Sequence, residues 1–366
     1  MTDNQYDIEM IKQYQHQVNN QILRLENNSE LKNIKFVEQL CCDDIKINKC
    51  SIQFDQVPLN IQILEITKCK LHNLQGLQQM KQLIVLVLNS DEIEDIQVLE
   101  SMQNLTLLSL VANLITDISA IKNLWKLKQL RLQYNRLQDI SAIGSLSNLT
   151  ELSLNSNNIN DIKSLQKLRN LTKLNLSKNS IGDITPLSHL TNLESLSLSD
   201  TRVSDIYSLK YLQKLQILHL YNTQVIDISA LQYLTNLMEL DILHCQVVNI
   251  SALKQLNDKA EIEITNNYVL DLSPISHIDP NTVHNNNQRG PTAEHIRLSL
   301  KLEQIFNIRE KTQFFKQKRR QFQTKIDQFQ QNRSCMQKTL EQQHNAFMVK
   351  TSRLFNLLIF DESQFQ

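Results

Sequence analysis

One pattern of apolar residues recurs every 22 residues through most of this 366-residue chain. One copy has the form Leu149-x-x-Leu152-x-Leu154-x-x-Asn157, where x is any residue. Equivalent copies begin at Leu105, Leu127, Leu149, Leu171, Leu193, Leu215 and Leu237. A unit this short cannot bury its own apolar residues, so consecutive units must stack on one another into a solenoid.

The asparagine position of the pattern extends the repeats toward both ends of the chain. It is occupied in turn by Cys50, Cys69, Asp91, Asn113, Asn135, Asn157, Asn179, Thr201, Thr223, Cys245 and Asn267. The step is 22 residues throughout, apart from 19 residues between Cys50 and Cys69, and a weaker turn begins near Asn20. We therefore predict a solenoid of about twelve turns over residues 20–278, preceded by an N-terminal helical or capping segment over residues 1–19.

The first half of each repeat predicts a short strand followed by a bend. Leu130 and Leu132 alternate with Arg131, so the leucines face the core and Arg131 faces the concave side of a parallel sheet. The asparagine that follows the strand can hydrogen-bond the backbone of its own turn and of the next turn. Cysteine or threonine at this position bonds more weakly.

The second half of each repeat predicts a short helical turn on the convex side. In one copy, Thr185 is expected as the N-cap and Pro186 as the first helical residue. An aspartate precedes most of these turns, as follows: Asp95, Asp117, Asp139, Asp161, Asp183, Asp205, Asp227 and Asp271. Such a carboxylate can accept backbone N–H groups, so we interpret the row as structural rather than as a calcium site.

The predicted fold class is therefore α/β: a leucine-rich-repeat solenoid with a parallel concave sheet and short helical turns on the convex side, followed by a C-terminal α-helical segment. The two parts differ in charge. Residues 291–366 carry 13 Lys and Arg against 7 Asp and Glu, whereas residues 1–290 carry 25 against 31. Residues 279–291 lack an apolar period and are predicted to form a linker.

Apolar residues of the C-terminal segment, residues 292–366, recur every seven residues between positions 305 and 357. One row holds Ile305, Ile326, Leu340, Phe347 and Leu354, and the other holds Ile308, Phe315, Phe322, Phe329, Met336 and Leu357. This spacing predicts either a coiled coil, as a homodimer or with a partner helix, or a helix that folds back over the end of the solenoid.

Composition argues against catalysis and cofactor binding. The four glycines lie far apart, which excludes a phosphate-binding loop, and the six cysteines lack the spacing of metal ligands. We therefore expect no enzyme activity, no cofactor and no metal. The first residues do not resemble a signal peptide, and no apolar run is long enough to span a membrane, so we expect a cytoplasmic protein.

The concave face is the predicted partner-binding surface, because outward-facing apolar and aromatic residues there have no place in the core. Its candidate residues form an apolar patch, a central pair and a C-terminal patch. They are Ile63, Val85, Val87, Leu107 and Val111; Arg131 and Tyr134; and His219, Tyr221, Asp241, His244 and Glu263. An alternative for the apolar patch is that the N-terminal segment, Tyr6 to Val18, folds over it.

Residues from about 42 to 278 resemble the 22-residue class of leucine-rich repeats found in the regulatory subunit of type-1 protein phosphatase and in the internalin repeat region. The resemblance is carried by repeat residues such as Leu149, Leu152, Leu154, Asn157 and Ile159. It implies a curved protein-binding scaffold without chemistry of its own. The terminal cap of the phosphatase-binding relatives is not evident after Ile278, and a basic heptad tail follows instead.

Three functions are open at this point. The preferred one is a non-catalytic scaffold or adaptor that binds protein through the concave face. The first alternative is a regulatory or targeting subunit of an enzyme such as a protein phosphatase. The second is association with a membrane or nucleic acid through the basic cluster Lys316–Arg320, which nearby acidic residues make a weaker candidate.

Overall fold

The structure is a computed structural model that describes residues 22–26, 62–67, 71, 74–285, 295, 297–314, 316–318, 320–321 and 323–324. The chain divides into two compact units, residues 1–303 and residues 304–366. The predicted N-terminal segment 1–19, Cys50, Cys69 and the heptad positions beyond residue 324 lie outside the described residues.

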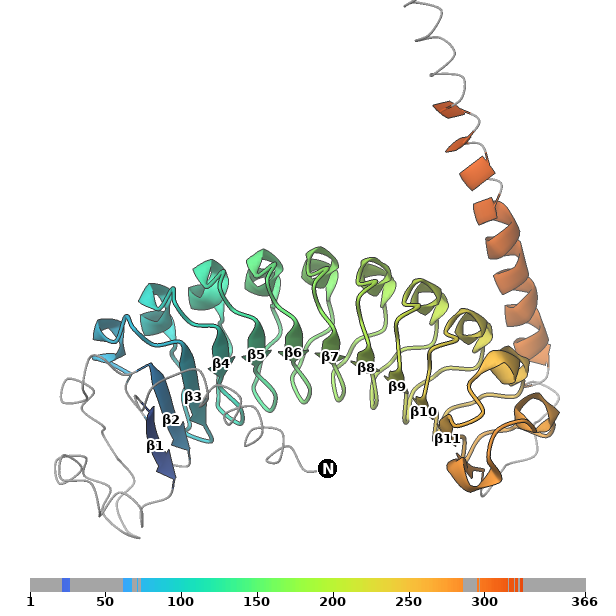
Figure 1. Ribbon diagram of the computed structural model, residues 1–366, viewed down its shortest axis with the longest axis horizontal. Helices are drawn as coiled ribbons and strands as arrows, with labels where there is room; N and C mark the ends of the chain where they lie inside the picture. The colour runs from blue at the N-terminus through green and yellow to red at the C-terminus, as the bar shows by residue number, and fades with distance from the viewer. Residues whose placement is uncertain are drawn as a thin grey trace, which may run out of the picture. The chain divides into compact units, whose positions relative to one another are not determined.

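Twelve parallel strands in chain order form one sheet along the inner side of the curved first unit (Figure 1). They are β1 (Ile22–Glu26), β2 (Ile63–Thr67), β3 (Val85–Asn89), β4 (Leu107–Ser109), β5 (Gln129–Arg131), β6 (Glu151–Ser153), β7 (Lys173–Asn175), β8 (Ser195–Ser197), β9 (Ile217–His219), β10 (Glu239–Asp241), β11 (Glu261–Glu263) and β12 (Val283–His284). The register joins equivalent residues of successive repeats, as in Leu130 with Leu152. The solenoid and its parallel concave sheet are thus confirmed.

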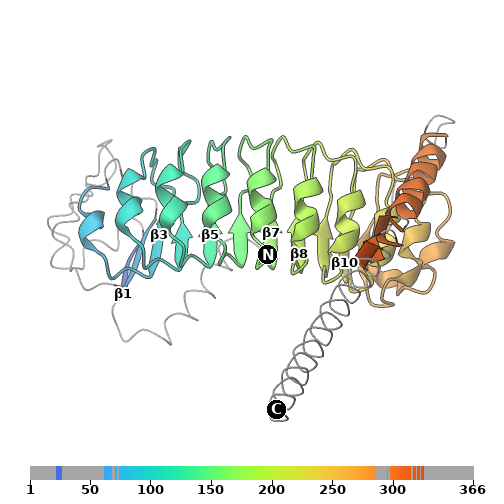
Figure 2. The ribbon, with the colours of Figure 1, turned by 90° about the horizontal axis from the view of Figure 1, so that it is seen from above.

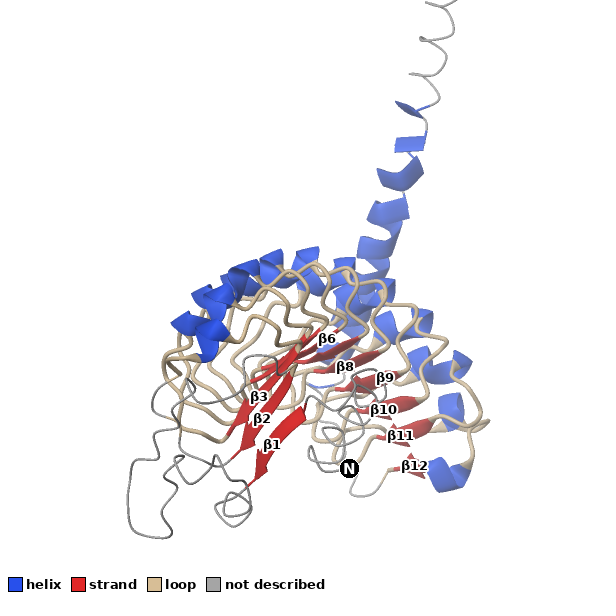
Figure 3. Ribbon diagram, turned by 60° about the vertical axis from the view of Figure 1, so that its left-hand side comes forward, coloured by secondary structure: helices blue, strands red, loops and turns tan. Residues whose placement is uncertain are grey.

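Short 3-10 helices line the outer, convex side, as the views from above and from the side show (Figures 2 and 3). They are η4 (Leu77–Gln79), η5 (Gln97–Ser101), η6 (Ser119–Asn123), η7 (Ser141–Ser145), η8 (Lys163–Lys167), η9 (Thr185–His189), η10 (Tyr207–Tyr211), η11 (Ser229–Tyr233), η12 (Ser251–Gln255), η13 (Ser273–Ile275) and η14 (Pro280–Thr282). Both η14 and β12 fall within residues 279–291, where the sequence predicts a linker.

The aspartate row holds the start of these 3-10 helices. Asp183 Oδ1 accepts the N–H of Thr185 at 2.8 Å, and Asp139 Oδ1 accepts the N–H of Ser141 at 2.7 Å. The structural interpretation of the row is therefore confirmed. The prediction that Thr185 is the N-cap was wrong, because Ile184 occupies that position and the capping oxygen comes from the residue before it.

Substitution of Asp139 with alanine should lower the free energy of unfolding by about 1 kcal/mol, because the N–H of Ser141 loses its acceptor. Thermal unfolding followed by circular dichroism would measure the loss. Asp139→Asn keeps an acceptor oxygen and should stay close to the wild type. An equal loss in both variants would show that the charge matters and the hydrogen bond does not.

The asparagine of each turn joins it to the preceding turn. Asn157 Oδ1 accepts the N–H of Leu137 at 3.0 Å, while its Nδ2 donates to the carbonyl of Leu132 and to that of Leu154 in its own turn, both at 3.0 Å. The side chain is buried, so these bonds satisfy backbone groups that water cannot reach. The expected bond to the own turn is confirmed, but the second bond runs to the preceding turn rather than to the next.

Three successive turns carry a smaller residue at this position. Thr201 and Thr223 donate to the carbonyl of their own turn, at Leu198 and Leu220, and the hydroxyl of Thr223 also lies 3.2 Å from the sulfur of Cys245 in the next turn. Cys245 donates from sulfur to the carbonyl of Leu220 at 3.1 Å. Since a thiol is a weak donor and a hydroxyl replaces only one arm of the amide, these turns are linked less firmly than the asparagine turns.

A helix follows the solenoid and begins against its last turns. His295 stacks on Tyr268 with ring centroids 4.0 Å apart, and Asn249 Nδ2 lies 3.4 Å from Glu303 Oε2. Helical residues continue through 297–314 and, with gaps in the description, to residue 324. Within the described part of the chain, no helix is both long enough and apolar enough to span a membrane.

Candidate protein-binding surface

The concave face consists of ordered columns of side chains, because every strand of the sheet has the same register. The first column holds the residue before the central apolar residue of each strand, from Ile63 on β2 to Glu261 on β11. The second column holds the residue after it, from Glu65 to Glu263. The third column holds the residue two positions further along, from Thr67 to Thr265.

The apolar patch at β2–β4 is not an exposed surface. Ile63, Val85 and Leu107 are each 1% exposed and Val87 is 5% exposed, and the four form one buried cluster. Val111 is half-buried. The expectation of an open apolar patch is corrected for Ile63, Val85, Val87 and Leu107: they lie on the concave side of the sheet, yet they are as buried as the core leucines.

The middle of the face, from β5 to β7, is open and mainly basic. Arg131 is half-buried in the second column, and Tyr134 is 46% exposed. Tyr134 has a φ of 59°, in the left-handed region, as has Lys178 at 54°. Lys173 forms an ion pair with Glu151 on the neighbouring strand at 3.0 Å. This part therefore combines an exposed tyrosine ring with the basic side chains Arg131, Lys173 and Lys178.

The C-terminal part, from β9 to β11, brings the predicted residues of that patch together. Tyr221 and His244 meet edge to face with ring centroids 5.7 Å apart. His219 Nε2 lies 2.8 Å from Glu239 Oε1. Strand register pairs His219 with Asp241, so Glu239 is absent from the residues that the sequence predicts for this patch. Glu239 is thus a further member of the surface.

Asp241 is a half-buried carboxylate of this patch. Burial raises the pKa of Asp241, and the carboxylates of Glu263 and Glu239 act in the same direction, against the opposing effects of the Leu243 N–H and of His219. The N–H of Leu243 donates to Asp241 Oδ1 at 2.9 Å. A cationic group of a partner would relieve the repulsion between these carboxylates, so the site favours positive charge.

The raised pKa of Asp241 predicts a pH effect on stability. Between its ordinary pKa and the higher folded-state value, the folded protein holds a proton that the unfolded chain has lost, so stability falls as pH rises through this interval. Asp241→Asn keeps the oxygen that accepts the Leu243 N–H and removes the charge. It should raise the melting temperature at pH 7, and the gain should vanish below about pH 4. Glu261→Gln, an exposed control, should change little, and a gain of the same size there would contradict the assignment.

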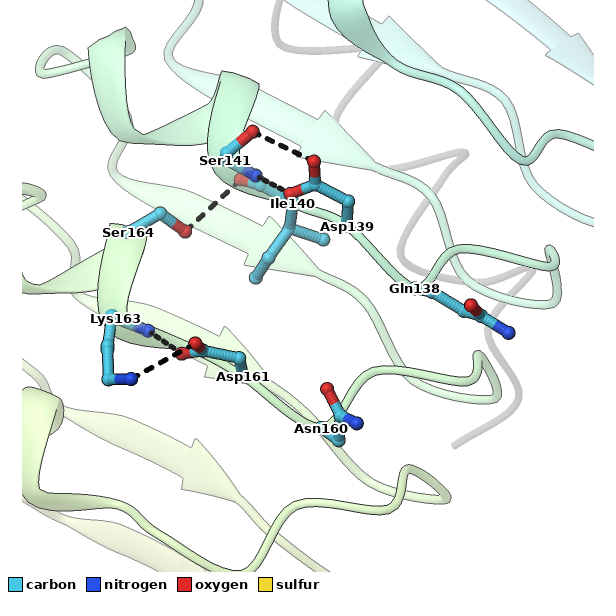
Figure 4. Close-up of a pocket in the computed structure, with 8 residues that line it drawn as sticks. All are labelled: Gln138, Asp139, Ile140, Ser141, Asn160, Asp161, Lys163 and Ser164. Carbon is cyan, nitrogen blue, oxygen red and sulfur yellow. Dashed lines mark hydrogen bonds and ion pairs between the residues drawn. The ribbon is translucent and has the colours of Figure 1, made fainter.

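The described residues contain no group of three or more His, Cys, Asp or Glu side chains placed to hold a metal ion. A groove of about 390 Å³ beside η7 and η8 has two aspartates in its wall (Figure 4). Asp139 binds the backbone and hydroxyl of Ser141, and Asp161 binds the N–H of Lys163 at 2.8 Å and its Nζ at 3.4 Å. The oxygens of each aspartate bond groups within its own turn, and we assign no ligand to this groove.

These repeats, strands and columns form a leucine-rich-repeat solenoid. A family model described as leucine rich repeats in two copies matches residues 125–167, 147–189 and 169–211. Leucine-rich repeats generally act in protein–protein interaction, and they are typically not enzymes.

Solved structures show the same fold. An internalin (inlF) from Listeria monocytogenes is 23% identical, with a TM-score of 0.52 over 67% of this chain and 85% of its own. A leucine-rich-repeat protein from Leptospira interrogans is 22% identical, with a TM-score of 0.56 over 66% of this chain and 70% of its own. No curated protein matches the sequence. The resemblance to the phosphatase regulatory subunit stays a prediction.

Proposed function

We propose that the protein is a non-catalytic scaffold that holds a protein partner on the concave face from β5 to β11. The observation that carries this proposal is the contrast along the face. The second column is half-buried from Arg131 to Glu263, whereas its members on β2–β4, Glu65, Val87 and Ser109, are buried. The open part therefore supplies the surface that a partner reaches first.

The residues of this open surface are held before a partner arrives. The ring of Tyr221 contacts that of His244, and the imidazole of His219 is held by Glu239. Side chains that are already ordered lose less entropy on binding, and aromatic residues carry much of the energy in protein interfaces. The basic middle and the acidic C-terminal part further favour a partner whose charges alternate in the opposite order.

A capture experiment would test this surface. Three proteins would each be immobilised on a resin and incubated with cell extract. They are the full chain, a concave variant carrying Tyr134→Ala and Tyr221→Ala, and a convex control carrying Lys122→Ala and Lys167→Ala. Captured proteins would be identified and then titrated in purified form. We expect affinity to fall at least tenfold in the concave variant and to be unchanged in the control. Equal binding by all three proteins would refute the assignment of the concave face.

We further propose that the C-terminal helix, through residues 305–357, forms a homodimeric coiled coil. Ile305 is 36% exposed and Ile308 is 63% exposed, three positions apart at the start of the heptad rows. Apolar side chains on one helix face are buried when two such helices pair. Light scattering of the full chain should give the mass of a dimer, and Ile308→Asp should give a monomer. Asn307→Asp is the control, and a wild-type monomer at high concentration would end this proposal.

A further inference from the structure

In nine successive turns of the solenoid one equivalent residue has a left-handed backbone, and none of the nine is glycine. The turns that follow β5 and β7 hold Tyr134, with a φ of 59°, and Lys178, with a φ of 54°. Four later turns hold Asp, Asn or His, which tolerate this backbone, whereas a long or bulky side chain is strained in it. A strained residue of this kind points to a function for its side chain, which makes Tyr134 and Lys178 candidates for binding.

Buried oxygen atoms without a hydrogen-bond partner occur in the same turns. Gln133 directly precedes Tyr134 and is only 7% exposed, and its Oε1 atom has no partner. Gln129 Oε1, on β5, is buried and unbonded in the same way. So is Ser156 Oγ, in the turn between those of Tyr134 and Lys178. A buried polar atom without a hydrogen bond is unfavourable, and a bound ligand can supply the missing group.

The charge of these turns is positive. Arg131 on β5 and Lys173 on β7 lie on the concave side, and Glu151 pairs with Lys173 at 3.0 Å. Lys178 is exposed and has no ion pair within the part of the chain that the structure describes. The carboxylate of Asp200, in the next turn, already accepts a hydrogen bond from an asparagine beyond it. An acidic group of a partner therefore meets uncompensated positive charge at Lys178.

We propose that the turns of β5 to β7 bind an extended, acidic segment of the partner protein. A carboxylate of the segment pairs with Lys178, and a backbone N–H of the segment donates to Gln133 Oε1. Because this oxygen is unbonded in the free protein, the Gln133 amide turns toward the partner without breaking a hydrogen bond. The inference rests on the proposed scaffold function and adds the chemistry of the partner.

The spacing of the groups fits an extended peptide. Tyr134 and Lys178 are two strand steps apart, which is about 10 Å at about 4.8 Å per step. Three extended residues cover this length at about 3.3 Å each. A peptide backbone also offers N–H groups, whereas the phosphates of a nucleic acid only accept hydrogen bonds and cannot satisfy Gln133 Oε1. The unbonded acceptor therefore favours a protein segment over a nucleic acid.

Binding of a capped peptide of alternating glutamate and alanine to the full chain would test this site. Fluorescence anisotropy measures the affinity, and a matched glutamine–alanine peptide is the control for charge. We expect Lys178→Gly to weaken binding about tenfold and to raise the melting temperature, because glycine relieves the strained backbone. Ala112→Gly relieves the same strain, at a φ of 56°, without removing a charge. It should raise the melting temperature and leave the affinity unchanged.

Gln133→Leu tests the second contact. Leucine is similar in size to glutamine and has no polar side-chain atom, so this variant should keep the melting temperature and bind the acidic peptide about fivefold more weakly. Methylation of the backbone nitrogens of the peptide should weaken its binding to the wild type. The same methylation should cause no further loss in Gln133→Leu, because the hydrogen bond is already absent there.

The proposal fails if the acidic and glutamine peptides bind equally, or if Lys178→Gly and Ala112→Gly have the same affinity. A single-stranded oligonucleotide that binds more tightly than the peptide, and that Lys178→Gly releases, would assign the site to nucleic acid instead. The capture experiment separates this site from the scaffold function. Loss of captured protein by the variant carrying Tyr134→Ala and Tyr221→Ala, without any binding of the acidic peptide to the wild type, would refute the acidic partner alone. Equal capture by all three proteins would refute the scaffold itself.

Discussion

Substitution of Leu152 with alanine is expected to lower the free energy of unfolding by about 2–5 kcal/mol. Leu152 is the buried centre of β6, in register with Leu130 on one side and Leu174 on the other. The loss combines the transfer of the missing side-chain atoms with the cavity that the neighbouring turns cannot fill. Because each turn of a solenoid contacts only its neighbours, the damage should also loosen the two adjacent turns.

Urea unfolding followed by circular dichroism would measure this loss. Ser153→Ala is the matched control, since Ser153 follows Leu152 on the same strand but lies half-buried on the concave side. It should change stability by less than about 0.5 kcal/mol. If the two variants were equally destabilised, the assignment of core and concave sides would be wrong.

Substitution of Asn157 with alanine should cost about 3 kcal/mol or more, because it leaves several buried backbone groups without a partner at once. The N–H of Leu137 loses its acceptor, and the carbonyls of Leu132 and Leu154 lose a donor. The loss should be visible in the same urea titration. It should also appear as faster amide hydrogen exchange at Leu137.

Asn157→Thr supplies the control for this prediction. Threonine occupies the equivalent place at Thr201, where its hydroxyl donates to the carbonyl of its own turn. Asn157→Thr should therefore keep the bond to Leu154 and lose those to the preceding turn, at a cost between that of the wild type and that of the alanine variant. A threonine variant as unstable as the alanine variant would show that the own-turn bond contributes nothing.

Much of the fold follows from the 22-residue period alone. The alternation around Leu130 and Leu152 identifies the strands, and the spacing of Asn157 identifies the bend, because local backbone geometry decides which side chains face the core. The aspartates such as Asp139 were also predictable, since a carboxylate two residues before an N–H can reach it without any help from tertiary structure. The N-cap residue of η9 was not predictable, because moving the start of the helix by one residue leaves the 22-residue pattern unchanged.

The burial and the contacts of the side chains on the concave face are determined by the tertiary structure. The repeat places Val85 and Lys173 at equivalent positions of their strands, yet Val85 is buried and Lys173 is exposed. The contact of His219 with Glu239 likewise runs diagonally between strands. Periodicity states which side of the sheet a residue faces, since that depends on its own strand. Burial on that side depends on segments distant in sequence, whose packing no repeat encodes.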